Sequence, residues 1–337
     1  MNTKSNLKIL VVVSLIVALL PFIIKSPYYM QILINIGSWT LISLGLTLLL
    51  GYAGQISFAQ VTFFGIGAYA TAIMTVTIGM SPLLALIVSA IVTGFVAFLI
   101  GLPVLRFKEH FLAVITIGFG IMVYVLLIQL SDITGGPGGF AGIPPFSIGS
   151  FQFKGDIANY YLIWFFSLLS ILIMINLLSS RIGRALETLR SSEIAAKSLG
   201  INAFTLKLKA FIFSGALAGV GGSLYAFQTS FIAPNTFEVL QSITFITIVI
   251  VGGLRSVWGA LVGAIVVTAI EQFMTHLLPL IIPGAGGELQ KIAYGLLLVL
   301  VLLFMPNGLV PTVSKLFKRG FSKKSKAKEF STVEQSN

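Results

Sequence analysis

The chain has 337 residues, of which 57% are hydrophobic and only 9% are charged, and it contains no cysteine. Soluble domains carry roughly 25% charged residues, so this composition excludes an ordinary soluble protein, and the lack of cysteine excludes disulfide frameworks and thiolate metal sites. The net charge of +11 is concentrated at the two ends and in one internal loop, a distribution that favours cytoplasmic loops of a membrane protein over a nucleic-acid-binding surface.

Apolar segments follow one another along almost the whole chain. A bilayer core about 30 Å thick needs about 20 apolar residues per helix, so ten helices would use roughly 200 residues. We therefore expect an all-α polytopic membrane protein of ten helices, or eight if two shorter segments do not cross. Residues 1–310 would form one transmembrane domain, and 311–337 a basic tail. The expected spans are 7–24, 30–50, 56–79, 83–102, 110–130, 160–178, 210–228, 239–253, 257–278 and 289–305.

Basic residues predict the orientation of these spans. Lys4 and Lys8, the segment 181–209 and the tail carry most of the positive charge, and cytoplasmic loops are enriched in Lys and Arg. An even number of helices then places both termini in the cytoplasm, with the first span kept as an uncleaved helix. Residues 131–159 become the largest outside loop, and their Gly-Pro punctuation predicts tight turns or a short re-entrant structure.

One expected span is unusually polar. The stretch "GYAGQISFAQVTFFGIGAYATAI" at 51–73 includes Gln55, Ser57, Gln60 and Thr62. On a continuous helix Gln55 and Thr62 would lie on one side, with Ser57 and Gln60 nearly opposite, so no single face is polar. Two compatible interpretations follow. These side chains bond to neighbouring helices, or the segment is interrupted and lines a substrate path.

Glycines in the same region predict close helix packing or a hinge. On a continuous helix Gly51, Gly54 and Gly65 share one sector, where another backbone can approach closely, and Gly67 follows two residues later. "GIGAYATA" at 65–72 and "GVGGSLYA" at 219–226 share a glycine-small-aromatic character. This similarity is compatible with two related five-helix halves.

Groups for chemistry are scarce in the expected spans. Glu271 is the one candidate for ion coupling, and an interhelical hydrogen bond is its simpler interpretation, so a proton- or sodium-coupled carrier is disfavoured. H-E-x-x-H, G-x-S-x-G and G-x-x-x-x-G-K-[ST] are all absent. We expect no enzymatic activity, no metal site and no bound cofactor, and another subunit would have to hydrolyse any ATP.

The loop 181–209 predicts a short capped helix. Ser192 can cap a helix that begins at Glu193, with Lys197 in its last turn and Gly200 in the left-handed position after it. Glu193 and Lys197 form an i,i+4 pair worth about 0.3–0.5 kcal/mol. Asn202 can cap the next helix, which leads into the following span.

This short helix resembles the EAA loop of ABC-importer permeases, in which a Glu-Ala-Ala stretch is followed by Gly. In "EIAAKSLGI" at 193–201, Ala195, Ala196 and Gly200 keep the spacing, while Ile194 adds a residue after Glu193. The resemblance implies a coupling helix that docks on an ATPase through Glu193, Ala195, Ala196, Lys197 and Gly200. The two alanines are small enough to enter a groove on a partner. The alternative is an ordinary amphipathic interfacial helix.

Four further stretches resemble the branched-chain amino-acid permeases: "GYAGQISFAQVTFFGIGAYATA" (51–72), "FLAVITIGFG" (111–120), "TGGPGGFAGIP" (134–144) and "GALAGVGGSLYA" (215–226). The long 134–144 loop and the basic tail are closer to the LivM-type subunit than to its paired H-type subunit. Two positions depart from the family pattern. Ile121 follows Gly120 where an acidic residue is common, and Arg255 interrupts the usual small residues of 252–256.

The resemblance implies a permease subunit of an ABC importer for branched-chain or aliphatic amino acids in a bacterial or archaeal cytoplasmic membrane. Its partners would be an H-type permease, two ATPase subunits that hold ATP and magnesium, and an extracytoplasmic binding protein, with membrane lipids around it and no nucleic acid. The nearest alternative is the same type of permease for urea or short amides. A stand-alone channel or secondary carrier is more distant.

Overall fold

The computed structural model describes residues 3–107 and 109–281, with a few positions between 295 and 310. Within these residues the chain is almost entirely helical, which confirms the predicted all-α class. Eight of the described helical segments are long and apolar enough to cross a membrane, one of which, Gln60–Thr77, joins a 13-residue α-helix to a π-helical turn, and a ninth apolar helix is shorter. Apart from a few positions, the predicted tenth span, 289–305, and the tail, 311–337, lie outside the described residues.

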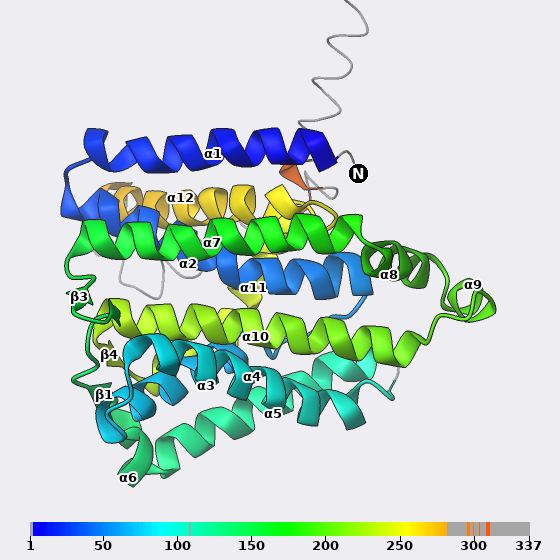
Figure 1. Ribbon diagram of the computed structural model, residues 1–337, viewed down its shortest axis with the longest axis horizontal. Helices are drawn as coiled ribbons and strands as arrows, with labels where there is room; N and C mark the ends of the chain where they lie inside the picture. The colour runs from blue at the N-terminus through cyan, green and yellow to red at the C-terminus, as the bar shows by residue number, and fades with distance from the viewer. Residues whose placement is uncertain are drawn as a thin grey trace, which may run out of the picture.

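The long helices run side by side along the longest dimension of the molecule (Figure 1). They are α1 (Thr3–Ile23), α2 (Pro27–Leu46), α4 (Pro82–Val104), α5 (Glu109–Gln129), α7 (Asp156–Ser179), α10 (Ala203–Thr229) and α12 (Val257–Ile281). The shorter helices are α3 (Gln60–Ala72), α6 (Ser131–Thr134), α8 (Arg181–Ser191), α9 (Glu193–Ser198) and α11 (Leu240–Gly252). The π-helical turns Thr47–Ala53 and Ile73–Thr77 extend α2 and α3, and Gly136–Gly138 and Pro234–Phe237 are 3-10 turns.

The two ends of the molecule differ. The start of α1 lies at the same end as α8 and α9, while the strands lie at the other (Figure 1); we call these the α9 end and the strand end. β1 (Phe140–Ala141) pairs with β4 (Phe231–Ile232), and β2 (Ser147–Ile148) pairs with β3 (Phe151–Gln152). The loop 131–159 therefore folds as the tight turns that its glycines predict.

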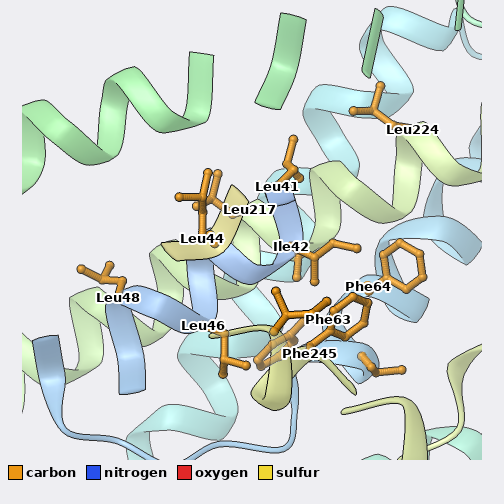
Figure 2. Close-up of a cluster of buried hydrophobic side chains, with 14 of the residues drawn as sticks. Leu41, Ile42, Leu44, Leu46, Leu48, Phe63, Phe64, Leu217, Leu224 and Phe245 are labelled. Atoms are coloured by element: carbon orange, nitrogen blue, oxygen red, sulfur yellow. The ribbon is translucent and has the colours of Figure 1, made fainter. Parts of the chain in front are cut away.

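Helices α2 and α10 form the centre of the bundle. In their most apolar stretches, 78% of the residues of α2 and 72% of those of α10 are buried. The corresponding share for α1, which lies at the edge against α7, is 11%. Figure 2 shows leucines and Ile42 of α2 packed with Phe63 and Phe64 of α3 and with side chains of α10 and α11. Most side chains of α1 are therefore exposed, whereas α2 and α10 supply the protein core.

Helices α2 and α10 are antiparallel (Figure 1), and the chain repeats one pattern after each of them. A stretch without α-helix follows (54–59 after α2, 230–239 after α10), and then a shorter helix, α3 or α11, that runs back alongside the bundle. The two returns enter from opposite ends. This order fits two related halves of opposite direction, a relation that stays a prediction because the last expected helix lies outside the described residues.

The two similar glycine motifs pack against each other rather than lying apart. A β-carbon on Gly67 of α3 would lie 2.5 Å from the Cα of Gly219 on α10, and one on Gly222 would lie 2.0 Å from the Phe64 carbonyl oxygen. Nearby, the Thr71 hydroxyl donates to Ser223 Oγ at 2.7 Å. The absence of side chains thus lets α3 and α10 run parallel in backbone contact.

We expect Gly67→Ala to lower the thermal stability of the detergent-purified chain. The added methyl group must push α3 away from α10, and overpacking of this kind costs about 1–3 kcal/mol. The matched control is Gly118→Ala on α5, where an added β-carbon would meet nothing within 4 Å. Equal melting temperatures for the two variants would show that the α3–α10 contact is not tight.

Candidate functional site

The interrupted segment begins where α2 ends. The π-helical turn carries the helix to Ala53, Gly54 adopts the left-handed conformation with φ +70°, and residues 54–59 are not helical before α3 starts at Gln60. Glycine tolerates this φ because it has no β-carbon. The continuous helix assumed for 51–73 is therefore wrong, and so is the grouping of Gly51, Gly54 and Gly65 on one helical sector.

Helix α3 starts near the middle of the bundle. The Gln60 side-chain Nε2 donates to the Ile42 carbonyl of α2 at 2.8 Å, and its Oε1 accepts from Ser214 Oγ of α10 at 2.9 Å. Ile42 lies about 15 Å along the helix from Ala53, and Ser214 is likewise far from both ends of α10. Residues 54–59 thus bring the chain back from the α9 end to mid-depth.

Neighbouring helices satisfy the backbone of this return. The Phe58 N–H donates to Thr116 Oγ1 of α5 at 3.0 Å, and the Phe58 carbonyl accepts from Ser242 Oγ of α11 at 2.7 Å. The Ala59 N–H donates to Ser57 Oγ at 3.2 Å. Non-helical backbone survives at membrane depth only with such partners, so both interpretations of this stretch meet here: it is interrupted, and its polar groups bond to neighbours.

The second return carries an aromatic side chain to the same region. Phe237, in the 3-10 turn before α11, is buried with its ring 5.3 Å from Phe64 and 5.8 Å from Tyr69. A β-carbon on Gly65 would lie 2.9 Å from Phe237 Cγ, so this glycine provides the space for the ring. The 3-10 turn before α11 therefore contacts α3, and the two helices run in opposite directions.

The four residues predicted for a substrate path are all buried in this conformation. Gln55 and Ser57 are each 1% exposed, and Gln60 and Thr62 are also buried. Neither Oε1 nor Nε2 of the Gln55 side chain has a hydrogen-bond partner among the described residues. The role of these four residues in a substrate path stays a prediction.

The capping predictions for the loop 181–209 are confirmed. Ser192 Oγ accepts from the Ala195 N–H at 3.2 Å, Gly200 has φ +75°, and the Asn202 side chain accepts from the Thr205 N–H at 3.1 Å. The predicted i,i+4 ion pair joins Glu193 and Lys197 at 3.0 Å. Both ends of this short helix could therefore be predicted from local sequence.

Lys207 of α10 adds an ion pair that the sequence did not reveal. Its Nζ lies 3.0 Å from Glu193 Oε2 and ties α9 to the start of α10. The hydrogen bonds from Lys207 and Lys197 hold the pKa of the Glu193 carboxyl below its usual value. Glu193 thus anchors α9 to the protein itself, a function different from direct contact with a partner.

The expectation that Ala196 enters a groove on a partner is wrong for this conformation. Ala196 is 0% exposed and packs against Leu189 of α8 and Ala203 of α10. Ala195 is exposed, and the large apolar side chains that α9 presents are Ile194 and Leu199, which are 80% and 71% exposed. The resemblance to a Glu-Ala-Ala motif drew attention to the alanines and away from these two residues.

A cluster of arginines lies beside α9, and we did not predict its contacts. Arg190 of α8 donates to the carbonyls of Leu50 and Gly51, and Arg184 donates to the Ser179 carbonyl at 3.1 Å. Both interactions place a cation at the C-terminal end of a helix, where the dipole is negative. The adjoining cavity of about 310 Å³ is lined by Gly51, Tyr52, Leu178, Ser179, Gly183, Arg184, Glu187, Arg190 and Arg255.

Comparison with known proteins covers most of the chain. The sequence model of the family described as "Branched-chain amino acid transport system / permease component" matches residues 28–302. The chain is 30% identical to the high-affinity branched-chain amino acid transport system permease protein LivM of Salmonella typhimurium, over 81% of this chain and 68% of that protein.

Two proteins of Methanocaldococcus jannaschii are also similar. The probable branched-chain amino acid transport permease protein LivM is 25% identical over 83% of this chain and 92% of its own, and the LivH counterpart is 30% identical over 83% and 90%. No solved structure matches the chain at a significant level.

The two buried glutamines should respond differently to the same substitution. Gln60→Leu removes the acceptor of the Ser214 hydroxyl and a donor to the Ile42 carbonyl, and leaving the buried hydroxyl unpaired costs about 1–3 kcal/mol. Gln55→Leu removes an amide that has no described partner, so we expect its stability to be unchanged or higher. Thermal unfolding of both variants in detergent measures the difference. A larger loss for Gln55→Leu than for Gln60→Leu would contradict this account.

Proposed function

The chain belongs to the branched-chain amino acid transport system permease family, and from this membership we propose that it translocates branched-chain or related aliphatic amino acids as the membrane-spanning subunit of an ATP-driven importer. The observation that carries the proposal is the match of the family model to residues 28–302, which includes every described helix from α2 to α12. The other subunits and the direction of transport belong to this proposal.

The bundle interior suits a neutral zwitterion. The buried polar side chains of the described spans are hydroxyl and amide groups, among them Thr62, Thr71 and Ser223, while Glu271 is half-buried. Such groups can hydrogen-bond to the charged ends of an amino acid without trapping either charge, and the aliphatic walls suit its side chain. Discrimination among amino acids would then rest mainly with an extracytoplasmic binding protein.

The helix α9 would couple transport to ATP hydrolysis. Its exposed Ile194 and Leu199 provide two apolar contacts for an ATPase subunit, while Ser192, Glu193 and Gly200 keep the helix in shape. ATP and magnesium would lie on a pair of such subunits. The basic α9 end would face the cytoplasm by the positive-inside rule, and an H-type permease would complete the membrane part.

Movement of α9 would switch the bundle between two conformations. In alternating access, a rigid shift at one end opens the path to one side while closing it to the other. The buried Gln55, Ser57, Gln60 and Thr62 fit a closed conformation in which the path is not continuous. The glycine contacts of α3 with α10 favour movement of these two helices as one unit.

Reconstitution tests the proposal. Vesicles that hold this chain with an H-type permease and two ATPases, supplied with ATP and a loaded binding protein, are expected to accumulate leucine, isoleucine or valine. Vesicles that hold this chain alone should not, because it has no P-loop. Uptake by the isolated chain on an ion gradient would refute the proposal, and uptake of urea or a short amide instead would change the substrate.

The apolar contacts of α9 can be tested with one double variant. Ile194→Asp together with Leu199→Asp should reduce uptake by at least about tenfold, because two carboxylates would have to be desolvated at the ATPase contact. Membrane insertion should stay normal, since both side chains are exposed. The control is Ile182→Asp on α8, which alters another exposed isoleucine away from α9. Normal ATPase binding by the double variant would exclude this contact surface.

A further inference from the structure

Helices α8 and α9 form one compact unit at the α9 end. Only Ser192 separates them, and Leu189 of α8 packs against Ala196 of α9 and Ala203 at the start of α10. The Ser192 N–H donates to the Thr188 carbonyl at 3.0 Å, and the Ala196 N–H to the Ser192 carbonyl at 3.0 Å. Because these contacts fix α9 against α8, a displacement of α9 also displaces α8.

Arg190 links this unit to the end of α2. It lies in the last turn of α8, and its Nη1 donates to both the Leu50 and the Gly51 carbonyls. The last carbonyls of a helix have no partner within it, and a guanidinium can bond to two of them at once. The contact joins residues 140 positions apart, so it is a tertiary link and no part of the local fold of α8.

The turn at Leu50 and Gly51, whose carbonyls Arg190 holds, leads directly into residues 54–59. Gly54 turns the chain three residues after Gly51, and Phe58 then contacts Thr116 of α5 and Ser242 of α11. Gly51 itself is fixed closely against the connection between α11 and α12, because a β-carbon there would lie 1.8 Å from the Leu254 carbonyl oxygen. Displacement of this turn must therefore act on the segment that joins α3, α5 and α11.

Space for such a displacement adjoins the contact. The residues that line the cavity of about 310 Å³ include Gly51, Tyr52, Arg184, Arg190 and Arg255. The Tyr52 hydroxyl donates to the Arg255 carbonyl at 2.9 Å. A turn bordered by open volume can shift without first breaking the packed core between α2 and α10.

We propose that Arg190 is the positioning residue that transmits movement of α9 to residues 54–59, by holding the Leu50 and Gly51 carbonyls. This inference rests on the proposed function, because it gives the movement of α9 a route to the middle of the membrane. Arg190 holds the end of α2 in register with α8, and a shift of the α8–α9 unit moves that end and the segment beyond Gly54.

The first experiment measures coupling in the complete reconstituted importer. Arg190→Gln, which loses the charge and the two-carbonyl contact, should lower uptake by roughly tenfold, the usual scale for a lost charge-assisted hydrogen bond. Basal ATP hydrolysis should persist, so that more ATP is used per amino acid moved. Arg190→Lys should be intermediate, because it keeps the charge but loses the longer, planar guanidinium that places Nη1 between the two carbonyls.

The matched control is Arg184→Gln on the same helix. Its guanidinium donates to the nearby Ser179 carbonyl and does not reach α2, so uptake and the ATP used per amino acid should stay close to wild type. If Arg190 only stabilises the fold, uptake and ATP hydrolysis should fall together in Arg190→Gln. An unchanged ratio of ATP to solute would therefore overturn the proposal.

The second experiment needs neither substrate nor ATPase. Because the chain has no cysteine, Gln55→Cys gives one reactive site in a side chain that is 1% exposed. Adding Arg190→Gln should speed its reaction with a water-soluble maleimide by roughly tenfold, whereas adding Arg184→Gln should not.

The two experiments separate this inference from the proposed function. If the wild-type complex fails to move amino acids, the proposed function fails, and the labelling of the isolated full-length chain still decides whether Arg190 holds the segment. If labelling is equal with and without Arg190→Gln, the link is absent whatever the complex transports. Faster labelling together with an altered ATP-to-solute ratio supports transmission.

Discussion

Backbone N–H and C=O groups that leave a helix inside a membrane must find partners within the protein, and residues 54–59 are where this chain meets that requirement. Each unpaired group in hydrocarbon costs several kcal/mol, so the return from the α9 end to mid-depth is possible only between helices that offer side-chain partners. Thr116 of α5 and Ser242 of α11 do so at Phe58. The placement of α5 and α11 around this segment follows from that need.

The same requirement explains why the centre is polar without being charged. Gln60 joins α2 to α10 through one side chain, and the buried polar residues of α2 next to Ile42, Thr40 and Ser43, carry hydroxyl groups and no charge. A charged residue in its place would carry a desolvation cost that an amide avoids. Glycine contacts such as Gly67 with Gly219 supply the rest of the cohesion, because they depend on shape and leave no polar group to satisfy.

Local signals in the sequence predicted much of this structure. Span positions follow from the apolar runs, and Ser192, Gly200 and Asn202 cap as expected because a cap involves only its neighbours. The start of α3 at Gln60 could not be predicted in this way, since the break depends on partners more than 50 residues away. For the same reason the burial of Ala196 against α8 and α10 had no signal in "EIAAKSLGI".

Gln55 shows how such a fold can remain able to change conformation. Its amide is buried without a described partner, and an unsatisfied buried polar group lowers the stability of the conformation that contains it. A second conformation in which water reaches this amide does not carry that cost. The difference in free energy between the two conformations is therefore smaller than it would be if Gln55 had a partner in the first. Contacts at Phe58 and Gly51 thus stabilise the observed conformation of the segment, while the unpaired Gln55 amide destabilises it. When two conformations are close in free energy, a small displacement at one end of the bundle is enough to change their populations.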